Sequence, residues 1–199
     1  MMKGELLYEG KAKKIFLTDN PDRVIHYFKD DATAFNAQKR GTIREKGVVN
    51  NKISSTIFQF LAGQGIPNHF IRQLSDREML TRRVAIIPVE VVVRNRATGS
   101  IVSRLGLEEG LTFDPPLIEF FYKNDALGDP LITEEHMRVL RLATSSQIET
   151  MREQALHINK VLRPFFEKKG ILLVDFKLEF GSGDDQVVLA DEISPDTCR

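Results

Sequence analysis

Near its end the chain alternates apolar and charged residues with the period of a β-strand. Between residues 174 and 180, four apolar side chains fall on one face, and the opposite face carries Asp175, Lys177 and Glu179. The Gly- and Asp-rich residues 181–185 read as a hairpin loop, and residues 186–190 as the returning strand. A loop of that length would place Asp191 opposite Asp175, on the charged face.

The remaining pattern predicts strands, a helix, strands, a second long helix and this hairpin, in that order. That order is typical of an α+β fold with largely antiparallel sheets. The expected elements are strands at 5–9, 13–17 and 23–29, a helix around 49–61, strands between 70 and 100, a short helix from 133 and a long helix from 146.

Three local features refine this pattern. Residues 30–41 are polar without a clear period and are expected to form a loop. The residues 146–149 have the composition of a capping box and are expected to start the long helix. Pro164 is expected to kink the last turn of that helix or to end it early.

Composition restricts the function classes. Lys and Arg number 28, as do Asp and Glu, so the net charge of zero gives no support for bulk nucleic-acid or membrane binding. No apolar run approaches the length of a membrane span, and the first residues lack a signal-peptide core. The single cysteine, Cys198, fits a reducing cytoplasm. The four histidines show no metal-ligand spacing and are assigned no chemistry.

The charged face of the hairpin is a candidate metal and phosphate site. One lysine and three carboxylates suit Mg²⁺ holding phosphates, because this ion prefers a few carboxylate oxygens together with phosphate and water oxygens. The alternative is a solvated sheet face with cross-strand ion pairs, the usual meaning of such alternation. The hairpin alone does not decide between them.

Residues 10–13 form a second candidate. Gly10 would let backbone amides approach an anion closely, and Lys11 and Lys13 would supply charge for a polyphosphate. The spacing is not that of a Walker loop. Taken by itself, the segment is better explained as a basic hairpin tip.

The third candidate is a strand of β-branched residues that runs into Arg94 and a small-residue turn ending at Ser100. An arginine at the end of a buried strand is costly unless it meets an anion. Arg94 and Ser100 are therefore a candidate clamp for a phosphate or a carboxylate. The alternative is a strand end that frays into solvent, where an arginine is harmless.

Four segments together resemble the SAICAR synthetase (phosphoribosylaminoimidazole-succinocarboxamide synthase) family of purine biosynthesis. They are YEGKAK at 8–13, PVEVVVRN with TGS between 88 and 100, LVDFKLEFG at 173–181 and DEISPD at 191–196. They occur in the family's order along the whole chain. The resemblance implies a two-lobed α+β fold related to the ATP-grasp enzymes, with antiparallel sheets and flanking helices. It places the lobes at residues 1–84 and 85–199.

The resemblance also implies an activity. The family joins L-aspartate to the carboxylate of carboxyaminoimidazole ribonucleotide (CAIR), using ATP and Mg²⁺, and releases SAICAR, ADP and phosphate. The implied partners are therefore these small molecules, and a homodimer or larger homo-oligomer is expected. The missing Ser/His or Cys/His constellation is no objection, because phosphoryl transfer needs positioning and charge neutralisation more than a protein nucleophile.

The same resemblance implies roles for individual residues. Lys177 and Asp175 are the expected catalytic residues; whether Asp175 holds a lysine or accepts a proton from the amine stays open. Glu179 and Asp191 are the expected metal ligands. The substrate-anchoring residues are expected to be Arg94, Ser100 and Arg199. The expected ATP-binding residues are Gly10, Lys11, Ala12, Lys13, Lys123, Glu179 and Asp191.

Two further expectations concern the whole chain. Family members usually continue beyond the position of Arg199, so the C-terminal lobe is expected to be truncated. The alternatives to a ligase are a kinase-like phosphotransferase, which would transfer phosphate to a hydroxyl, and a nucleotide-binding module without turnover. Dependence of ADP release on aspartate separates the ligase from both.

Overall fold

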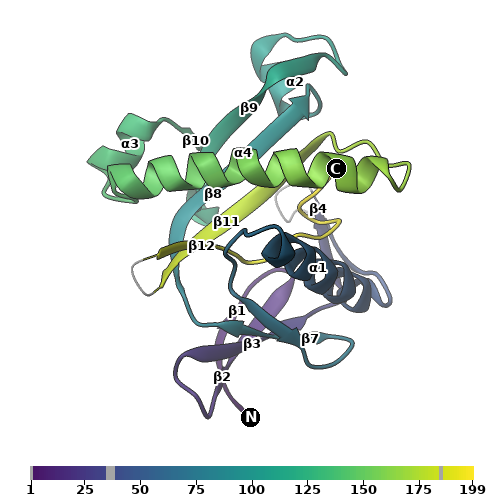
Figure 1. Cartoon of the computed structure of the whole chain (residues 1–199), viewed down its shortest axis with the longest axis vertical. Coiled ribbons are helices and arrows are strands. Elements are labelled where there is room, and N and C mark those ends of the chain that lie inside the picture. Colours follow the sequence, from purple (N-terminus) through teal and green to yellow (C-terminus); the bar gives the residue numbers. More distant parts are fainter. Residues whose placement is uncertain (1, 35–38, 184–185) are drawn as a thin grey trace. The chain divides into compact units, whose positions relative to one another are not determined.

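A computed structural model describes residues 2–34, 39–183 and 186–199. By their internal contacts the residues divide into two units, Met1–Ala85 and Ile86–Arg199. Each unit has its own five-stranded sheet (Figure 1). No helix among the described residues is both long and apolar enough to span a membrane.

The first unit is an antiparallel sheet in the order β1-β2-β3-β7-β6. Its strands are β1 (Lys3–Glu9), β2 (Lys13–Thr18), β3 (Arg23–Phe28), β7 (Glu78–Arg82) and β6 (Phe70–Gln73). The tight step expected between the first two strands is confirmed, because the amide of Gly10 donates to the carbonyl of Lys13 at 2.9 Å.

Helix α1 (Lys46–Gly63) packs against β3, β6 and β7 and confirms the helix expected around 49–61. Its buried face is more polar than the sequence pattern indicated. Asn51 is fully buried and donates to the carbonyls of Ser75 and Asp76, both at 3.0 Å, in the turn between β6 and β7. Val49 is apolar but 48% exposed, so it does not lie on the packed face. The helix is therefore rotated so that it can bind this turn.

The prediction that residues 30–41 form a loop is partly wrong. Strands β4 (Asp31–Ala34) and β5 (Lys39–Thr42) pair antiparallel, with Asp31 opposite Thr42. Backbone pairing needs no apolar side chains, so a periodicity search for buried residues misses such a ribbon. Residues 35–38 lie outside the described part of the chain.

The start of α1 leaves no room for a side chain at Gly47. A Cβ there would lie 2.4 Å from the carbonyl oxygen of Phe28, at the end of β3. We expect Gly47→Ala to lower the free energy of unfolding by about 2 kcal/mol, because a backbone oxygen held in the sheet cannot yield cheaply. Urea denaturation measures this. Gly63→Ala, in the same helix with no atom within 4 Å, is the control and should be neutral or slightly stabilising. Equal stability of the two variants would contradict the packing argument.

Asp30 ties the first turn of α1 to the sheet. Its carboxylate accepts two hydrogen bonds from the guanidinium of Arg77, at 2.6 and 2.9 Å, and one from the amide of Gly47 at 3.0 Å. The hydrogen bonds from Arg77 and then from Gly47 lower the pKa of Asp30 to about 2, against an ordinary value of 3.8. The ionised form is therefore the one that stabilises the folded state.

This pKa shift predicts a pH dependence. A depressed pKa contributes stability that is present above pH 3.8 and is lost as the pH falls through about 2. We expect the wild-type protein to exceed Asp30→Asn in free energy of unfolding at pH 5 to 7, and the difference to shrink as the pH falls from about 4 to 2. Denaturant titrations across this range test the trend. A difference that does not change with pH would show that the carboxylate charge is irrelevant.

The second unit contains a sheet in the order β10-β9-β8-β11-β12. Its strands are β10 (Leu131–Ile132), β9 (Thr112–Tyr122), β8 (Ala85–Arg96), β11 (Asp175–Gly183) and β12 (Gln186–Ala190). The pairs β8–β9, β9–β10 and β11–β12 are antiparallel. Together with the first sheet, this confirms the α+β class with antiparallel sheets.

Helix α4 (Ser145–Glu167) crosses the second unit (Figure 1) and buries an apolar stripe consisting of Ile148, Met151, Ala155, Ile158 and Leu162. Its cap is Thr144, whose hydroxyl accepts from the amide of Gln147, so the expected start at Ser146 is wrong. The helix also continues through Pro164, so it does not end early; the proline removes only one hydrogen bond near the last turn. The shorter helices are α2 (Ser100–Leu105), η1 (Asp125–Leu127) and α3 (Glu134–Val139).

The hairpin register differs from the expected one. β11 extends to Gly183, which pairs with Gln186, and Phe180 pairs with Leu189. Gly181 and Ser182 thus belong to the strand, since neither residue type forbids an extended backbone. Residues 184 and 185 lie outside the described residues. Asp191 is therefore not opposite Asp175: it follows Ala190, the partner of Glu179.

Candidate functional site

Two charged clusters in the second unit share strand β11. The first surrounds Lys177, whose ammonium donates to Glu90 on β8 at 2.6 Å and to Glu179 at 3.1 Å. Glu179 is 3% exposed and also contacts the ammonium of Lys123, at the end of β9. The alternation in the sequence therefore does place Lys177 and Glu179 together. The sheet adds Glu90 from the neighbouring strand β8 and Lys123 from the residue after β9.

Lys177 is a permanent cation at this site. Burial alone would lower the pKa of Lys177. The negative charges of Glu179, Glu90 and Asp191, named by decreasing effect, outweigh burial together with the hydrogen bond to Glu90. The pKa is therefore raised above its ordinary value. Lys177 is therefore suited to bind an anion and unsuited to act as a base at neutral pH. Asp191 is among these charges, and it directly follows Ala190, the strand partner of Glu179.

Glu179 and Asp191 suit a metal ion that is completed by a ligand. Among the described residues no three His, Cys, Asp or Glu side chains form a metal-binding group. Mg²⁺ ordinarily takes one or two carboxylates and fills its remaining positions with phosphate oxygens and water. Glu179 and Asp191, which follows the strand partner of Glu179, would supply two carboxylates of that donor set.

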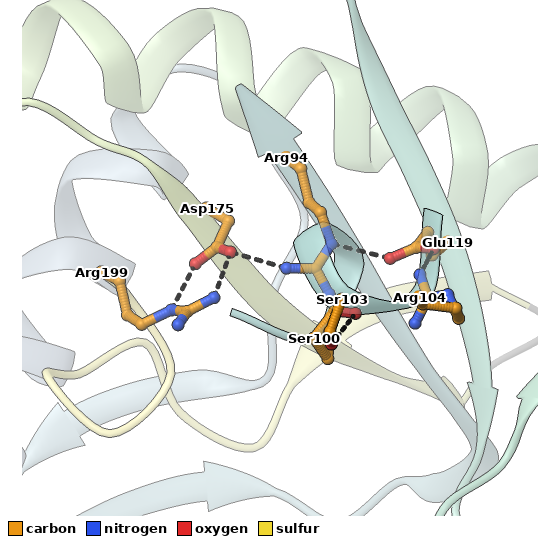
Figure 2. A network of polar contacts seen from close by, with 7 residues as sticks. All are labelled: Arg94, Ser100, Ser103, Arg104, Glu119, Asp175 and Arg199. Atoms are coloured by element: carbon orange, nitrogen blue, oxygen red, sulfur yellow. Dashed lines mark hydrogen bonds and ion pairs between the residues drawn. The ribbon is translucent and has the colours of Figure 1, made fainter. Parts of the chain in front are cut away.

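The second cluster surrounds Arg94, which is only 5% exposed (Figure 2). Its Nε donates to Glu119 at 2.7 Å and its Nη1 donates to Asp175 at 2.8 Å. The strand end does not fray, because β8 continues to Arg96 and the guanidinium meets two carboxylates of the protein itself. Such charge-assisted bonds fix the orientation of the guanidinium plane.

Asp175 binds a second arginine and, among the described residues, no lysine. It accepts hydrogen bonds from Nε of Arg199 at 2.9 Å and from Nη2 at 2.6 Å. The backbone brings the two residues together, since the amide of Val174 donates to the carbonyl of Arg199 at 2.7 Å. Of the two roles left open for Asp175, holding a neighbouring cation is the one that its contacts favour, although the cation is an arginine.

Gly99 brings the start of α2 against Arg199. It adopts a φ of 65° and a ψ of −131°, a conformation that only glycine adopts readily. A Cβ at this position would lie 3.0 Å from Nη1 of Arg199. Ser100 follows directly, so the three predicted anchoring residues gather around Asp175 and Gly99.

The predicted phosphate-binding residues 10–13 lie in the first unit, between β1 and β2. Lys11 is exposed, whereas Lys13 is 8% exposed and its ammonium lies 5.6 Å from the ring centroid of Phe28. The carbonyl of Ala12 accepts from the amide of Lys29 at 2.8 Å. Lys13 is therefore a largely buried cation, which the basic-tip interpretation did not anticipate.

Sequence reasoning missed three residues of these clusters: Glu90, Arg104 and Glu119. Two of them carried a signal, since Glu90 and Glu119 interrupt otherwise apolar strands, and a carboxylate within such a run indicates a buried partner. Arg104 carried none, because an arginine near the end of a short helix is ordinary.

Comparisons with known proteins identify one family along the chain. The family model described as SAICAR synthetase matches residues 6–199. The phosphoribosylaminoimidazole-succinocarboxamide synthase of Persephonella marina is 62% identical over 199 residues, which are 100% of this chain and 84% of that protein.

Solved structures agree with these sequence matches. The enzyme of the same name from Ehrlichia chaffeensis is 48% identical with a TM-score of 0.95, over 98% of this chain and 84% of that one. A SAICAR synthetase structure in complex with ADP is 45% identical with a TM-score of 0.94, over 98% of this chain and 83% of that one. The chain therefore belongs to the SAICAR synthetase family.

Proposed function

We propose that this chain joins L-aspartate to the carboxylate of CAIR, with ATP as the energy source, to give SAICAR, ADP and phosphate. The observation that carries the proposal is the pair of charged clusters on one face of β11. Asp175 with its arginines and Glu179 with its lysines are four residues apart on this strand, about 13 Å along it. A ribonucleotide can lie along the strand with its phosphate at one cluster and its reacting carboxylate at the other.

The chemistry requires an activated carboxylate. An oxygen of the CAIR carboxylate attacks the γ-phosphorus of ATP, and ADP leaves with the electron pair of the broken P–O bond. The amine of aspartate then attacks the carbonyl carbon of the acyl phosphate, phosphate leaves, and the nitrogen releases its proton. No protein nucleophile is needed, so the site must position the reactants and neutralise charge.

Residues of this chain supply those functions. Lys177, which stays protonated, offsets negative charge on the transferring group, and Lys123 beside Glu179 assists it. Glu179 and Asp191 would hold Mg²⁺, which would supply positive charge to offset the charge of the phosphates. Asp175 orients Arg94 and Arg199 toward the ribonucleotide phosphate, with Ser100 as a further donor.

The expected phosphate-binding residues Gly10, Lys11, Ala12 and Lys13 lie in the first unit. The relative described as bound to ADP supports nucleotide binding in this family. The family resemblance further supports a cytoplasmic homodimer or larger homo-oligomer. Neither the kinase-like alternative nor the non-catalytic module is favoured, because relatives as similar as 62% carry the synthase name.

The test is ADP release from ATP and Mg²⁺ with CAIR, with and without L-aspartate. The proposed function predicts release that requires CAIR and aspartate together. ADP release with a hydroxyl acceptor and no aspartate would identify a phosphotransferase. Nucleotide binding with no release under any of these conditions would identify a binding module.

A further inference from the structure

Glu119, on β9, holds two arginines, one on β8 and one near the end of α2. Its Oε2 accepts from Nε of Arg94 at 2.7 Å, and its Oε1 contacts Nη2 of Arg104. Figure 2 shows the carboxylate between these two side chains. Glu119 is 8% exposed, so little water competes for either oxygen. One buried carboxylate therefore fixes two guanidinium groups from different elements, β8 and α2.

Arg94 has one guanidinium nitrogen left for a ligand. Nε and Nη1 are occupied by Glu119 and Asp175, and within the described ranges 2–34, 39–183 and 186–199 no group accepts a hydrogen bond from Nη2. Nη2 is not among the buried polar atoms that lack a partner, so it keeps contact with solvent and a ligand can reach it. The two carboxylates thus set the direction in which this donor is offered.

Arg104 is placed to serve the same ligand. It lies four residues after Ser100 on α2, and positions i and i+4 share one face of a helix. Its side chain is 30% exposed, so a ligand can reach it, whereas Glu119 behind it is buried. Three guanidinium groups, those of Arg94, Arg104 and Arg199, gather here and are held by the carboxylates of Glu119 and Asp175. The charge of Glu109 also acts on Arg199.

We propose that Glu119 is a positioning residue for the ribonucleotide phosphate, acting through Arg94, and that Arg104 is a further residue that binds this phosphate. The inference rests on the proposed function and deepens it. Three guanidinium groups in one place suit a phosphate monoester, and guanidinium planes fixed by carboxylates suit its bidentate recognition. Glu119 keeps the arginines from rotating toward solvent when no substrate is bound.

The test compares Glu119→Gln and Arg104→Ala with the wild type at varied CAIR, ATP and aspartate. The glutamine variant keeps the shape of the side chain but presents an amide donor to one guanidinium group. Each variant should raise KM for CAIR about tenfold or more, as expected for the loss of one charge-assisted hydrogen bond. The kcat and the KM values for ATP and aspartate should stay within about twofold. Arg104→Lys should restore part of the CAIR affinity.

Glu134→Gln is the matched control. Glu134 lies on α3 and also bonds two arginines, Arg138 on the same helix at 3.0 Å and Arg152 on α4. It should leave all three KM values unchanged. An unchanged KM for CAIR in folded Glu119→Gln or in Arg104→Ala would overturn the inference. So would equal changes in all three KM values together with a fall in Tm, which would mark a purely structural role.

Direct titration separates this inference from the proposed function. If the wild type forms no SAICAR, the proposed function fails, and calorimetric titration with CAIR still tests the subsite. Weaker CAIR binding by both variants, with nucleotide binding retained, would support the inference. Equal binding by the wild type and both variants would overturn it.

Discussion

Glu179→Gln and Asp191→Asn are each expected to lower kcat for SAICAR formation by about a hundred- to a thousandfold. This is the range observed when one group that stabilises transition-state charge is removed. The change at Glu179 keeps the size of the side chain but removes the charge that holds Lys123 and Lys177 in place. Either change also removes a carboxylate oxygen from the proposed Mg²⁺ site, so a higher Mg²⁺ concentration should be needed for half-maximal activity.

Steady-state kinetics with a Mg²⁺ titration makes this measurement. Glu153→Gln removes an exposed carboxylate from α4 in the same unit and should change neither kcat nor the Mg²⁺ requirement. Near-normal activity in both site variants would refute the assignment of these two carboxylates to the metal. A loss of activity with an unaltered Mg²⁺ requirement would leave them with an electrostatic role on Lys177 alone.

Asp175→Asn is expected to affect both stability and substrate binding. The neutral side chain leaves Arg94, which is 5% exposed, with one carboxylate instead of two, and it releases Arg199. Removing one partner of a buried ion pair costs about 3 kcal/mol, because the remaining charge is left uncompensated. The KM for CAIR should rise about a hundredfold, since the orientation of two predicted phosphate-binding arginines is lost together.

Denaturant unfolding and CAIR kinetics check the two parts separately. Glu134→Gln, which disrupts more exposed arginine pairs on α3, should cost less than about 1 kcal/mol and leave the KM unchanged. Wild-type stability and wild-type KM in Asp175→Asn would show that the buried network positions nothing. A loss of stability without a change in KM would restrict Asp175 to the fold.

The alternation in β11 was enough to predict that Lys177 and Glu179 share a face, because the side-chain period of a strand depends only on local geometry. It did not fix the register of the hairpin. Gly181, Ser182 and Gly183 are typical of loops, yet the first two pair with Val188 and Val187 and the third with Gln186. A register follows from which residues the whole sheet buries, and this information is not local to the turn.

The contacts of Arg94 also depend on information that is not local in the sequence. The sequence indicated that Arg94 must meet anions, and it does, but its partners lie 25 and 81 residues away. Such pairings depend on the order of β9, β8 and β11 in the sheet, which periodicity does not encode. The family resemblance supplied the prediction that Arg199 and Ser100 anchor the substrate, and this stays a prediction. The geometry of Gly99 shows why a glycine precedes Ser100.

The most direct test of the ligase function is product analysis after incubation of the chain with ATP, Mg²⁺, CAIR and L-aspartate. Mass spectrometry should find SAICAR, ADP and phosphate in equal amounts, and none of them in excess of the no-enzyme control when aspartate or CAIR is omitted. ADP formed together with a phosphorylated hydroxyl product, or ATP consumed without SAICAR, would contradict the account.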